Sequence, residues 1–277
     1  MSASPDLIAS LQEDLALEHG AILQYLIHAF LLRDSALTDP VRKVAREEMW
    51  HFEWLVEAIR DRGGEPALER ADIFLSLSMT ESMAKDVVTE QGALSHYAHT
   101  LELIGDSDPE LSRLIERIAD DERHHRATFE RLAKIVRESG DAAYAAQAIM
   151  GPEDLAVVGP TIGLEYGSVL QYLFNKYGSG DCELGEQYFE FAVDEMRHLG
   201  WAANYVPGFG EPKPPPVPTD TVRFVRTPEE AADAAKRIEG VSAAFYAEKI
   251  NQARNPALAD DLARAASQHE YHRRLLG

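Results

Sequence analysis

The 277-residue sequence predicts an all-α protein made of two tandem four-helix bundles, each with one long crossover between its second and third helices. Eight long segments have apolar residues at the three- and four-residue spacing of an amphipathic helix. The pattern of the first four segments recurs in the last four, about 147 residues further along the chain. Each set of four has its long connection in the same place, as bundles with one crossover do. We therefore expect two domains, residues 1–150 and residues 151–277.

Proline and glycine mark the ends of the expected helices. Asp39-Pro40 and Asp108-Pro109 are typical helix starts, because proline is favoured at the first helical position. Gly63-Gly64 and Gly140 are typical stops. Apart from helix, we expect only a short extended piece at residues 222–225. The expected helices are residues 6–34, 39–62, 80–105, 109–138, 153–177, 183–205, 228–253 and 256–275.

The internal repeat aligns acidic and imidazole residues of the two halves. Residues 17–26 match residues 164–173 at an offset of 147 residues. The offset is 149 in the third segment and returns to 147 in the fourth. A small slip that a loop can absorb is what duplication of a four-helix unit predicts. The register pairs Glu18 with Glu165, Glu48 with Glu195, His51 with His198, Glu90 with Glu239, and His125 with His272.

Composition excludes several classes of function. The formal charge of −20 argues against nucleic acid and anionic membranes as partners. No stretch approaches the roughly 18 apolar residues of a membrane span, and the first residues do not have the pattern of a signal peptide. Cys182 is the only cysteine, so intramolecular disulfides and thiolate metal clusters are excluded. We expect a cytoplasmic protein with no membrane or nucleic-acid partner.

The first half of the chain places carboxylates and imidazoles on the apolar faces of all four expected helices. A Glu and a His three residues apart lie on one helix face, so both side chains can reach the same ion. A single such pair is more often a surface or core polar pair, but a full set on four inward faces favours a metal site. Carboxylate and imidazole ligands suit iron or manganese. The set is Glu18, Glu48, His51, Glu90, Glu122 and His125.

These motifs resemble those of the ferritin-like superfamily, which includes ferritin, bacterioferritin, rubrerythrin and the di-iron oxidases. The second helix, from Glu47-Glu48-Met49-Trp50-His51 to Gly63-Gly64-Glu65-Pro66, is most similar to that of bacterioferritin. The resemblance implies that the six residues of the first half bind two irons, with Glu48 and Glu122 as the bridging candidates. Manganese or a mixed iron–manganese pair is compatible with the same ligands. Tyr25 and Tyr97 follow Glu18 and Glu90 by one heptad, and we interpret both as packing residues, with hydrogen bonding to the ligands as the alternative.

The second half departs from this pattern at one position. His269 stands where Glu122 stands in the first half, whereas Glu165, Glu195, His198, Glu239 and His272 preserve the other five positions. Loss of a bridging carboxylate predicts an asymmetric metal pair, a single-metal site or an altered redox potential, and a purely structural second half is the alternative. We expect less metal, or a different metal, than in the first half.

The function that these patterns favour is an oxygen-dependent di-metal oxidase, whose simplest activity is the oxidation of ferrous iron. Oxidation of a small organic substrate is compatible with the same centre. The alternatives are iron storage of the bacterioferritin kind and a metal-stabilised helical protein without turnover. We expect a monomer or homodimer instead of a cage, because no fifth helix is visible in either half. Met49 and Met196 occupy the position of the haem-ligating methionine of bacterioferritin, but we do not expect haem.

Overall fold

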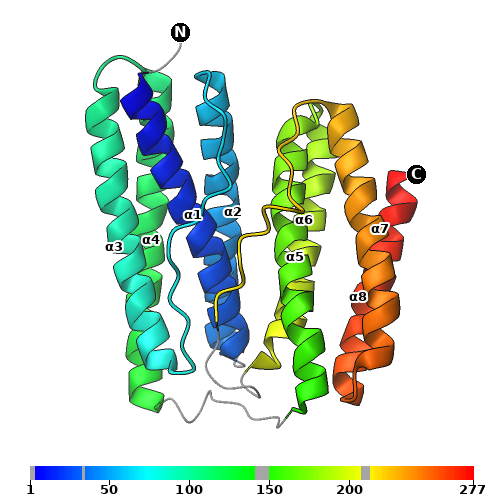
Figure 1. The fold of residues 1–277 in the computed structure, drawn as a ribbon. Coiled ribbons are helices and arrows are strands. Elements are labelled where there is room, and N and C mark those ends of the chain that lie inside the picture. Colours follow the sequence, from blue (N-terminus) through cyan, green and yellow to red (C-terminus); the bar gives the residue numbers. More distant parts are fainter. Residues whose placement is uncertain (1–3, 33–34, 141–149, 207–212) are drawn as a thin grey trace. The chain divides into compact units, whose positions relative to one another are not determined.

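The chain folds into helices that form two separate compact units. The computed structural model describes residues 4–32, 35–140, 150–206 and 213–277 (Figure 1). Within these residues there are eight α-helices and no strand, which confirms the all-α prediction. The two units are Met1–Ala146 and Gln147–Gly277, and each contains four helices.

Each unit is a four-helix bundle with its long connection between the second and third helices, as predicted. The first unit contains α1 (Pro5–Leu31), α2 (Ser35–Asp61), α3 (Met79–Ile104) and α4 (Pro109–Ser139). The second unit contains α5 (Pro152–Gly178), α6 (Cys182–Ala203), α7 (Pro228–Gln252) and α8 (Pro256–Leu276). All helix ends lie within three residues of the expected ones, except the start of α2.

Two local predictions were wrong. Helix α2 begins at Ser35, so Pro40 lies inside the helix and not at its first position. A proline this close to the N-terminus of a long helix removes only one hydrogen bond to the preceding turn, and the remaining turns tolerate the loss. Residues 222–225 belong to the second crossover and do not form a strand.

Side-chain caps explain why most helices begin where the sequence predicts. Asp108 accepts a hydrogen bond from the backbone N–H of Leu111, and Pro109 occupies the first position of α4. Ser78 caps α3 and Thr227 caps α7 in the same way. Gly140 ends α4 with a positive φ of 78°, a conformation that glycine adopts without steric cost.

Equivalent glutamines hold the two crossovers against their bundles. The side-chain oxygen of Gln24 on α1 accepts a hydrogen bond from the backbone N–H of Phe74, at 2.7 Å. The side chain of Gln171 on α5 bonds both the N–H and the carbonyl of Arg223, each at 2.8 Å. One glutamine in each copy therefore provides backbone hydrogen bonds to a segment that has no secondary structure of its own.

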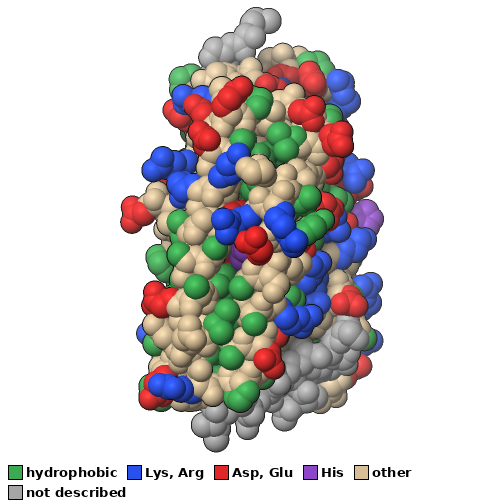
Figure 2. Space-filling model, turned by 90° about the vertical axis from the view of Figure 1, so that its right-hand side faces the viewer, with side chains coloured by type: hydrophobic (Ala, Val, Ile, Leu, Met, Phe, Trp, Pro, Cys, Tyr) green, Lys and Arg blue, Asp and Glu red, His purple; other side chains and the backbone are tan. Residues whose placement is uncertain are grey.

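The surface is mixed in charge, and the face shown in Figure 2 carries acidic and basic side chains interspersed with apolar ones. Apolar side chains are concentrated inside each bundle, where leucine, isoleucine, valine and aromatic residues are almost fully buried. Among the described helices, none is long and apolar enough to cross a membrane.

Candidate metal centres

The first unit encloses the six polar residues that the sequence singles out. Helix α1 supplies one of them, α2 two, α3 one and α4 two. None is more than 2% exposed, although four of the six are carboxylic acids. Burial of so many acidic groups is costly unless a positive charge lies among them. The six residues are Glu18, Glu48, His51, Glu90, Glu122 and His125.

Four of these side chains converge most closely, with potential ligand atoms within 4.8 Å of one another. His51 Nδ1 lies 2.8 Å from Glu48 and 3.0 Å from Glu122. His125 Nδ1 lies 3.0 Å from Glu48 and 3.6 Å from Glu122. Each of these two carboxylates therefore faces both imidazoles, which is the position that a carboxylate shared by two ions would occupy.

The other two carboxylates flank this group on opposite sides. Glu18 Oε2 lies 3.7 Å from His51 Nδ1. Glu90 lies close enough to Glu122 and His125 for the charges of both to act on its carboxyl group. The first centre thus divides into one half that contains Glu18 and His51 and another that contains Glu90 and His125.

Raised pKa values in the first centre show that its buried carboxylates lack a compensating positive charge. Burial raises the pKa of Glu18, and the neighbouring charges of Glu48 and Glu122 raise it further. Burial and the charge of Glu122 raise the pKa of Glu90. Burial opposes protonation of His51, yet close contacts with the surrounding carboxylates raise its pKa well above the ordinary value. Protons therefore supply the positive charge that a metal ion would supply.

Several buried atoms of the first centre have no hydrogen-bond partner within the described structure. A buried polar atom without a partner is costly, and its usual explanation is a missing water or ion. These atoms point to a group that the protein side chains do not provide, and their types are those that bind iron or manganese. They are both carboxylate oxygens of Glu48, Oε1 of Glu90, Oε1 of Glu122, Nδ1 of His51 and Nδ1 of His125.

The outward ring nitrogens of the histidines have partners that sequence reasoning missed. His125 Nε2 lies 3.0 Å from Glu47, and His51 Nε2 lies 3.5 Å from Asp121. A carboxylate at this position orients the ring and increases the basicity of the nitrogen that faces the ion. In the sequence, these partners could have been suspected because an acidic residue directly precedes both Glu48 and Glu122.

For Tyr97 the structure supports the alternative, hydrogen bonding to a ligand, in addition to packing. Its hydroxyl donates a hydrogen bond to Glu18 Oε1 across the interface of α1 and α3. The ring is fully buried, and the bond leaves Glu18 Oε2 as the oxygen nearer to His51. Tyr97 therefore sets the orientation of one carboxylate of the centre.

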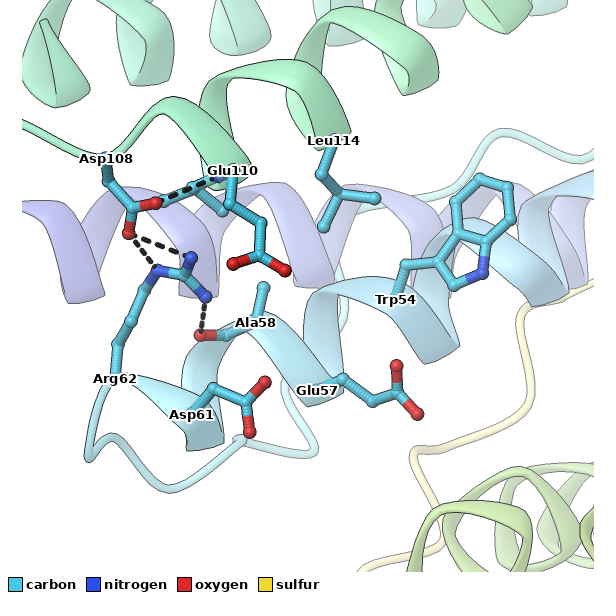
Figure 3. Close-up of a pocket in the computed structure, with 9 residues that line it drawn as sticks. Trp54, Glu57, Ala58, Asp61, Arg62, Asp108, Glu110 and Leu114 are labelled. Atoms are coloured by element: carbon cyan, nitrogen blue, oxygen red, sulfur yellow. Dashed lines mark hydrogen bonds and ion pairs between the residues drawn. The ribbon is translucent and has the colours of Figure 1, made fainter. Parts of the chain in front are cut away.

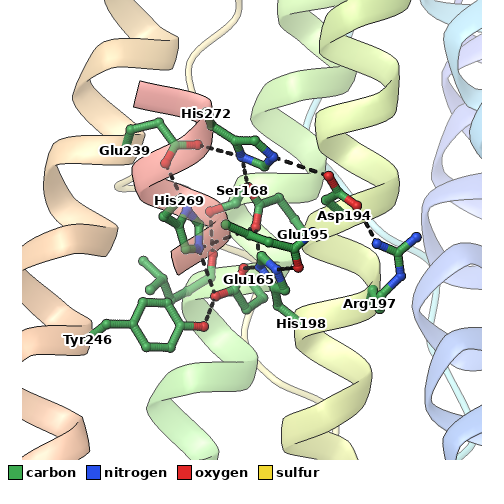
Figure 4. A network of polar contacts seen from close by, with 12 residues as sticks. Glu165, Ser168, Asp194, Glu195, Arg197, His198, Glu239, Tyr246, His269 and His272 are labelled. Carbon is green, nitrogen blue, oxygen red and sulfur yellow. Dashed lines mark hydrogen bonds and ion pairs between the residues drawn. The ribbon is translucent and has the colours of Figure 1, made fainter. Parts of the chain in front are cut away.

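The second unit brings its six predicted residues together in an equivalent centre (Figure 4). All six are buried, and their potential ligand atoms form two overlapping groups. The first group is Glu165, Glu195, His198 and His269. The second group is Glu195, Glu239, His269 and His272. Glu195 and His269 belong to both, as Glu48 and Glu122 are shared in the first centre.

Tyrosines and outer polar groups also surround the second centre. Tyr246 donates a hydrogen bond to Glu165, and Tyr172 donates one to Glu239. Tyr246 is the equivalent of Tyr97 in the repeat, and Tyr172 is the equivalent of Tyr25. Tyr25 is fully buried near Glu90, whose charge adds to burial in raising the pKa of its hydroxyl.

The outer partners of the histidines differ between the two centres. His272 Nε2 lies 3.2 Å from Asp194, which is equivalent to Glu47. His198 Nε2 lies 2.7 Å from the side-chain oxygen of Gln268, which replaces Asp121. Burial opposes protonation, but the charge of Glu195 raises the pKa of His198 to about 9. Hydrogen bonds to Asp194, Glu195 and Glu239 likewise raise the pKa of His272 to about 11 against the effect of burial.

A surface groove of about 510 Å³ lies between α2 and α4 of the first unit (Figure 3). Arg62 and Asp108 form an ion pair at 2.8 Å on its wall, and Arg62 also donates to the carbonyl of Ala58. Trp54 lines the groove and contacts His51, with ring centroids 5.7 Å apart. None of the six predicted ligands of the first centre lines the groove, so it lies beside that centre and is not part of it.

Met49 and Met196, the positions considered for haem, lie in the packed interior of their own units. Met49 is fully buried and Met196 is 7% exposed. Apolar packing is sufficient to explain both side chains.

Comparison with known proteins gives a family match for the first bundle. Residues 8–138, which span the first bundle, match the family model of the ferritin-like domain. This match supports the resemblance of the first bundle to the ferritin-like superfamily, and it covers the whole first centre.

Among curated proteins, the chain is similar to bacterioferritins. It is 27% identical to bacterioferritin from Desulfovibrio desulfuricans over 131 residues, which cover 46% of this chain and 73% of that protein. It is 28% identical to bacterioferritin from Streptomyces coelicolor over 154 residues, which cover 54% of this chain and 92% of that protein. Each match thus covers about half of this chain, an amount equal to one bundle.

Solved bacterioferritin structures give matches of the same extent. The structure of the Desulfovibrio desulfuricans protein, whose diiron site was seen in different catalytic states, has 26% identity and a TM-score of 0.47. It matches 50% of this chain and 85% of its own. A structure of mycobacterial bacterioferritin has 27% identity and a TM-score of 0.47, with 54% of this chain and 96% of its own covered.

Proposed function

We propose that the first bundle binds two iron ions and oxidises ferrous iron with dioxygen. The observation that carries this proposal is the convergence of buried carboxylate and imidazole atoms that lack hydrogen-bond partners. Four carboxylates balance the charge of two divalent ions, and the ligand types suit iron, manganese or one of each. The bacterioferritin relatives favour iron. We further propose that residues 1–150 and 151–277 act as separate functional domains.

In this proposal each residue has a role that follows from its position. One ion lies with Glu18 and His51, and the other with Glu90 and His125. Glu48 and Glu122 face both histidines and serve as the shared ligands.

The residues around the ligands keep the centre in one arrangement. Glu47 and Asp121 orient the two imidazoles, and Tyr97 holds one oxygen of Glu18. Iron supplies the electrons for the reduction of dioxygen when it is bound. The chain itself supplies the negative charge that stabilises the product, because four carboxylates favour the higher charge of ferric iron. No feature of the described residues singles out an organic substrate, so ferrous iron is the substrate that we propose.

The test is oxygen-dependent oxidation of ferrous iron by the full chain, followed by the near-ultraviolet absorbance of ferric iron. The variant Glu122→Gln removes one shared carboxylate and should slow oxidation at least about tenfold. Glu130→Gln is the charge-matched control, because Glu130 is an exposed residue two turns further along α4. Wild-type protein that oxidises iron no faster than buffer, or a Glu122→Gln variant as fast as wild type, would refute the proposal.

Iron storage is the second candidate function, and the bacterioferritin relatives are the observation that favours it. Both functions require oxidation of ferrous iron, but storage also requires an enclosed assembly. We propose a monomer or homodimer, since the fusion of two bundles in one chain constrains the assembly of a closed shell. Molar mass measured by light scattering decides between them: one or two chains support the oxidase alone, whereas a multi-hundred-kilodalton shell supports storage.

A further inference from the structure

The second centre differs from the first at two adjacent positions of its last helix. Asp121-Glu122 on α4 is replaced by Gln268-His269 on α8. Each replacement exchanges a carboxylate for a neutral side chain in contact with the centre. The second centre therefore has three inner carboxylates and three imidazoles, where the first has four and two.

His269 is oriented unlike the other histidines of the two centres. His51, His125, His198 and His272 each turn Nδ1 inward and Nε2 toward an outer partner. Both ring nitrogens of His269 instead face inner carboxylates. Nδ1 lies 2.8 Å from Glu239, and Nε2 lies 3.4 Å from Glu165 and from Glu195.

These contacts select one of the two overlapping groups as the site of an ion. An imidazole that binds a metal ion is neutral and has one N–H and one lone pair, which coordinates the ion. The shorter contact identifies Nδ1 of His269 as the donor to Glu239, so its Nε2 lone pair faces Glu165 and Glu195. Both oxygens of Glu239 already have donors, from Tyr172 and from the two histidines of α8. The lone pair of His269 is therefore directed at the group formed by Glu165, Glu195, His198 and His269.

The group selected in this way still has carboxylate oxygens without a well-aligned hydrogen bond. They are Glu165 Oε2 and Glu195 Oε1, which are fully buried and lie 3.7 Å from His198 Nδ1 and 3.3 Å from His272 Nδ1, respectively. Glu165, Glu195, His198 and His269 each offer one ligand atom, and these four atoms lie within 4.8 Å of one another. Four protein donors of these types suit a tetrahedral zinc-class ion.

Charge also distinguishes the second centre from an oxidation centre. Oxidation of a bound metal adds positive charge to a buried site, which requires compensation by nearby carboxylates. The second centre has lost two of them relative to the first, Glu122 among the ligands and Asp121 outside them. More imidazole and less carboxylate shift the preference from manganese-type ions toward zinc-type ions.

We propose that the second centre binds a single divalent ion of the zinc class through Glu165, Glu195, His198 and His269, and that this ion is not oxidised. The site lies in residues outside the ferritin-like domain match. The inference concerns a different ion from that of the proposed iron oxidation and does not depend on it.

The test uses the metal-free full chain, equilibrated without oxygen with equal amounts of zinc and ferrous iron. Metal content per chain is measured by mass spectrometry after removal of free ions. Anomalous diffraction at the zinc and iron absorption edges then locates each ion in crystals of the same sample. We expect one zinc ion per second centre, in contact with His269 Nε2. Iron in the second centre, two ions there, or no ion at all would each overturn the inference.

Two variants connect the result to the replaced residues. The double variant Gln268→Asp, His269→Glu gives the second centre the ligand set of the first, and should lower its affinity for zinc relative to iron at least about tenfold. Glu270→Gln is the control, since Glu270 is the exposed neighbour of His269 and should leave zinc binding unchanged. An unchanged zinc preference in the double variant would also overturn the inference. Iron in the first centre is measured separately in the same crystals. Failure of the iron site in the first centre can therefore be distinguished from failure of the zinc site in the second.

Discussion

Asp14 is a buried acid outside the metal centre, and it makes the stability of the first bundle depend on pH. It is fully buried on α1 and accepts a hydrogen bond from Thr100 at 2.6 Å, and Oδ1 has no partner. Burial raises the pKa of Asp14 from 3.8 to about 7, although the bond from Thr100 opposes the change. The folded chain thus binds this proton more tightly than the unfolded chain, and stability is lost as pH rises from 3.8 through about 7.

The size of the effect follows from these two pKa values. At ~1.36 kcal/mol for each pH unit, the full change is about 4 kcal/mol, of which about 2.5 kcal/mol falls between pH 5 and pH 8. The variant Asp14→Asn lacks the titrating group, so its stability relative to wild type should rise by about this amount from pH 5 to pH 8.

The assay is urea unfolding of the metal-free chain at several pH values. In a Trp201→Phe background the remaining tryptophans, Trp50 and Trp54, both lie in the first unit, so their fluorescence follows that unit. Glu102→Gln is the control, because it removes an exposed carboxylate from α3 close to Thr100, and it should follow the wild-type dependence on pH. Equal slopes of stability against pH for wild type and Asp14→Asn would refute the reasoning.

Three further substitutions test local features of the two bundles. Tyr97→Phe removes the hydroxyl that holds Glu18 and should weaken ferrous binding about 10- to 100-fold in anaerobic titration, and unchanged affinity would contradict the role of the hydroxyl. Gly178→Ala should destabilise the second bundle by about 1–3 kcal/mol, because the added Cβ would lie 2.5 Å from a methyl carbon of Val225. Gly240→Ala, where the methyl group meets nothing within 4 Å, should stabilise that bundle by up to about 1 kcal/mol. Urea midpoints measured in a Trp50→Phe, Trp54→Phe background, where Trp201 reports on the second unit, test both substitutions, and an equal shift in the same direction would be inconsistent with the packing.

The fold could be predicted from the sequence because each level of the pattern agreed with the others. Helical periodicity, caps such as Asp108 and the repeat all indicated the same eight helices. The start of α2 was missed because proline is a strong but not an absolute start signal. The short extended piece expected at residues 222–225 does not become a strand, because no partner strand is present among the described residues of the second unit.

The positions of the candidate ligands were also accessible from the sequence, since inward faces of four helices must meet at the centre of a bundle. Their immediate surroundings were not. The contact of Asp121 with His51 joins different helices, and its geometry depends on how α2 and α4 pack. For the same reason the direction of the Tyr97 hydroxyl and the two-sided orientation of His269 emerge only from the structure.

Mössbauer spectroscopy of the full chain, loaded with ferrous iron without oxygen and then exposed to it, tests the central claim most directly. If carboxylates and imidazoles of the first bundle hold two irons together, the ferrous signal should convert to that of a magnetically coupled ferric pair. The Glu122→Gln variant should not show this pair. Iron that stays ferrous, or that forms only isolated ferric ions, would contradict the claim.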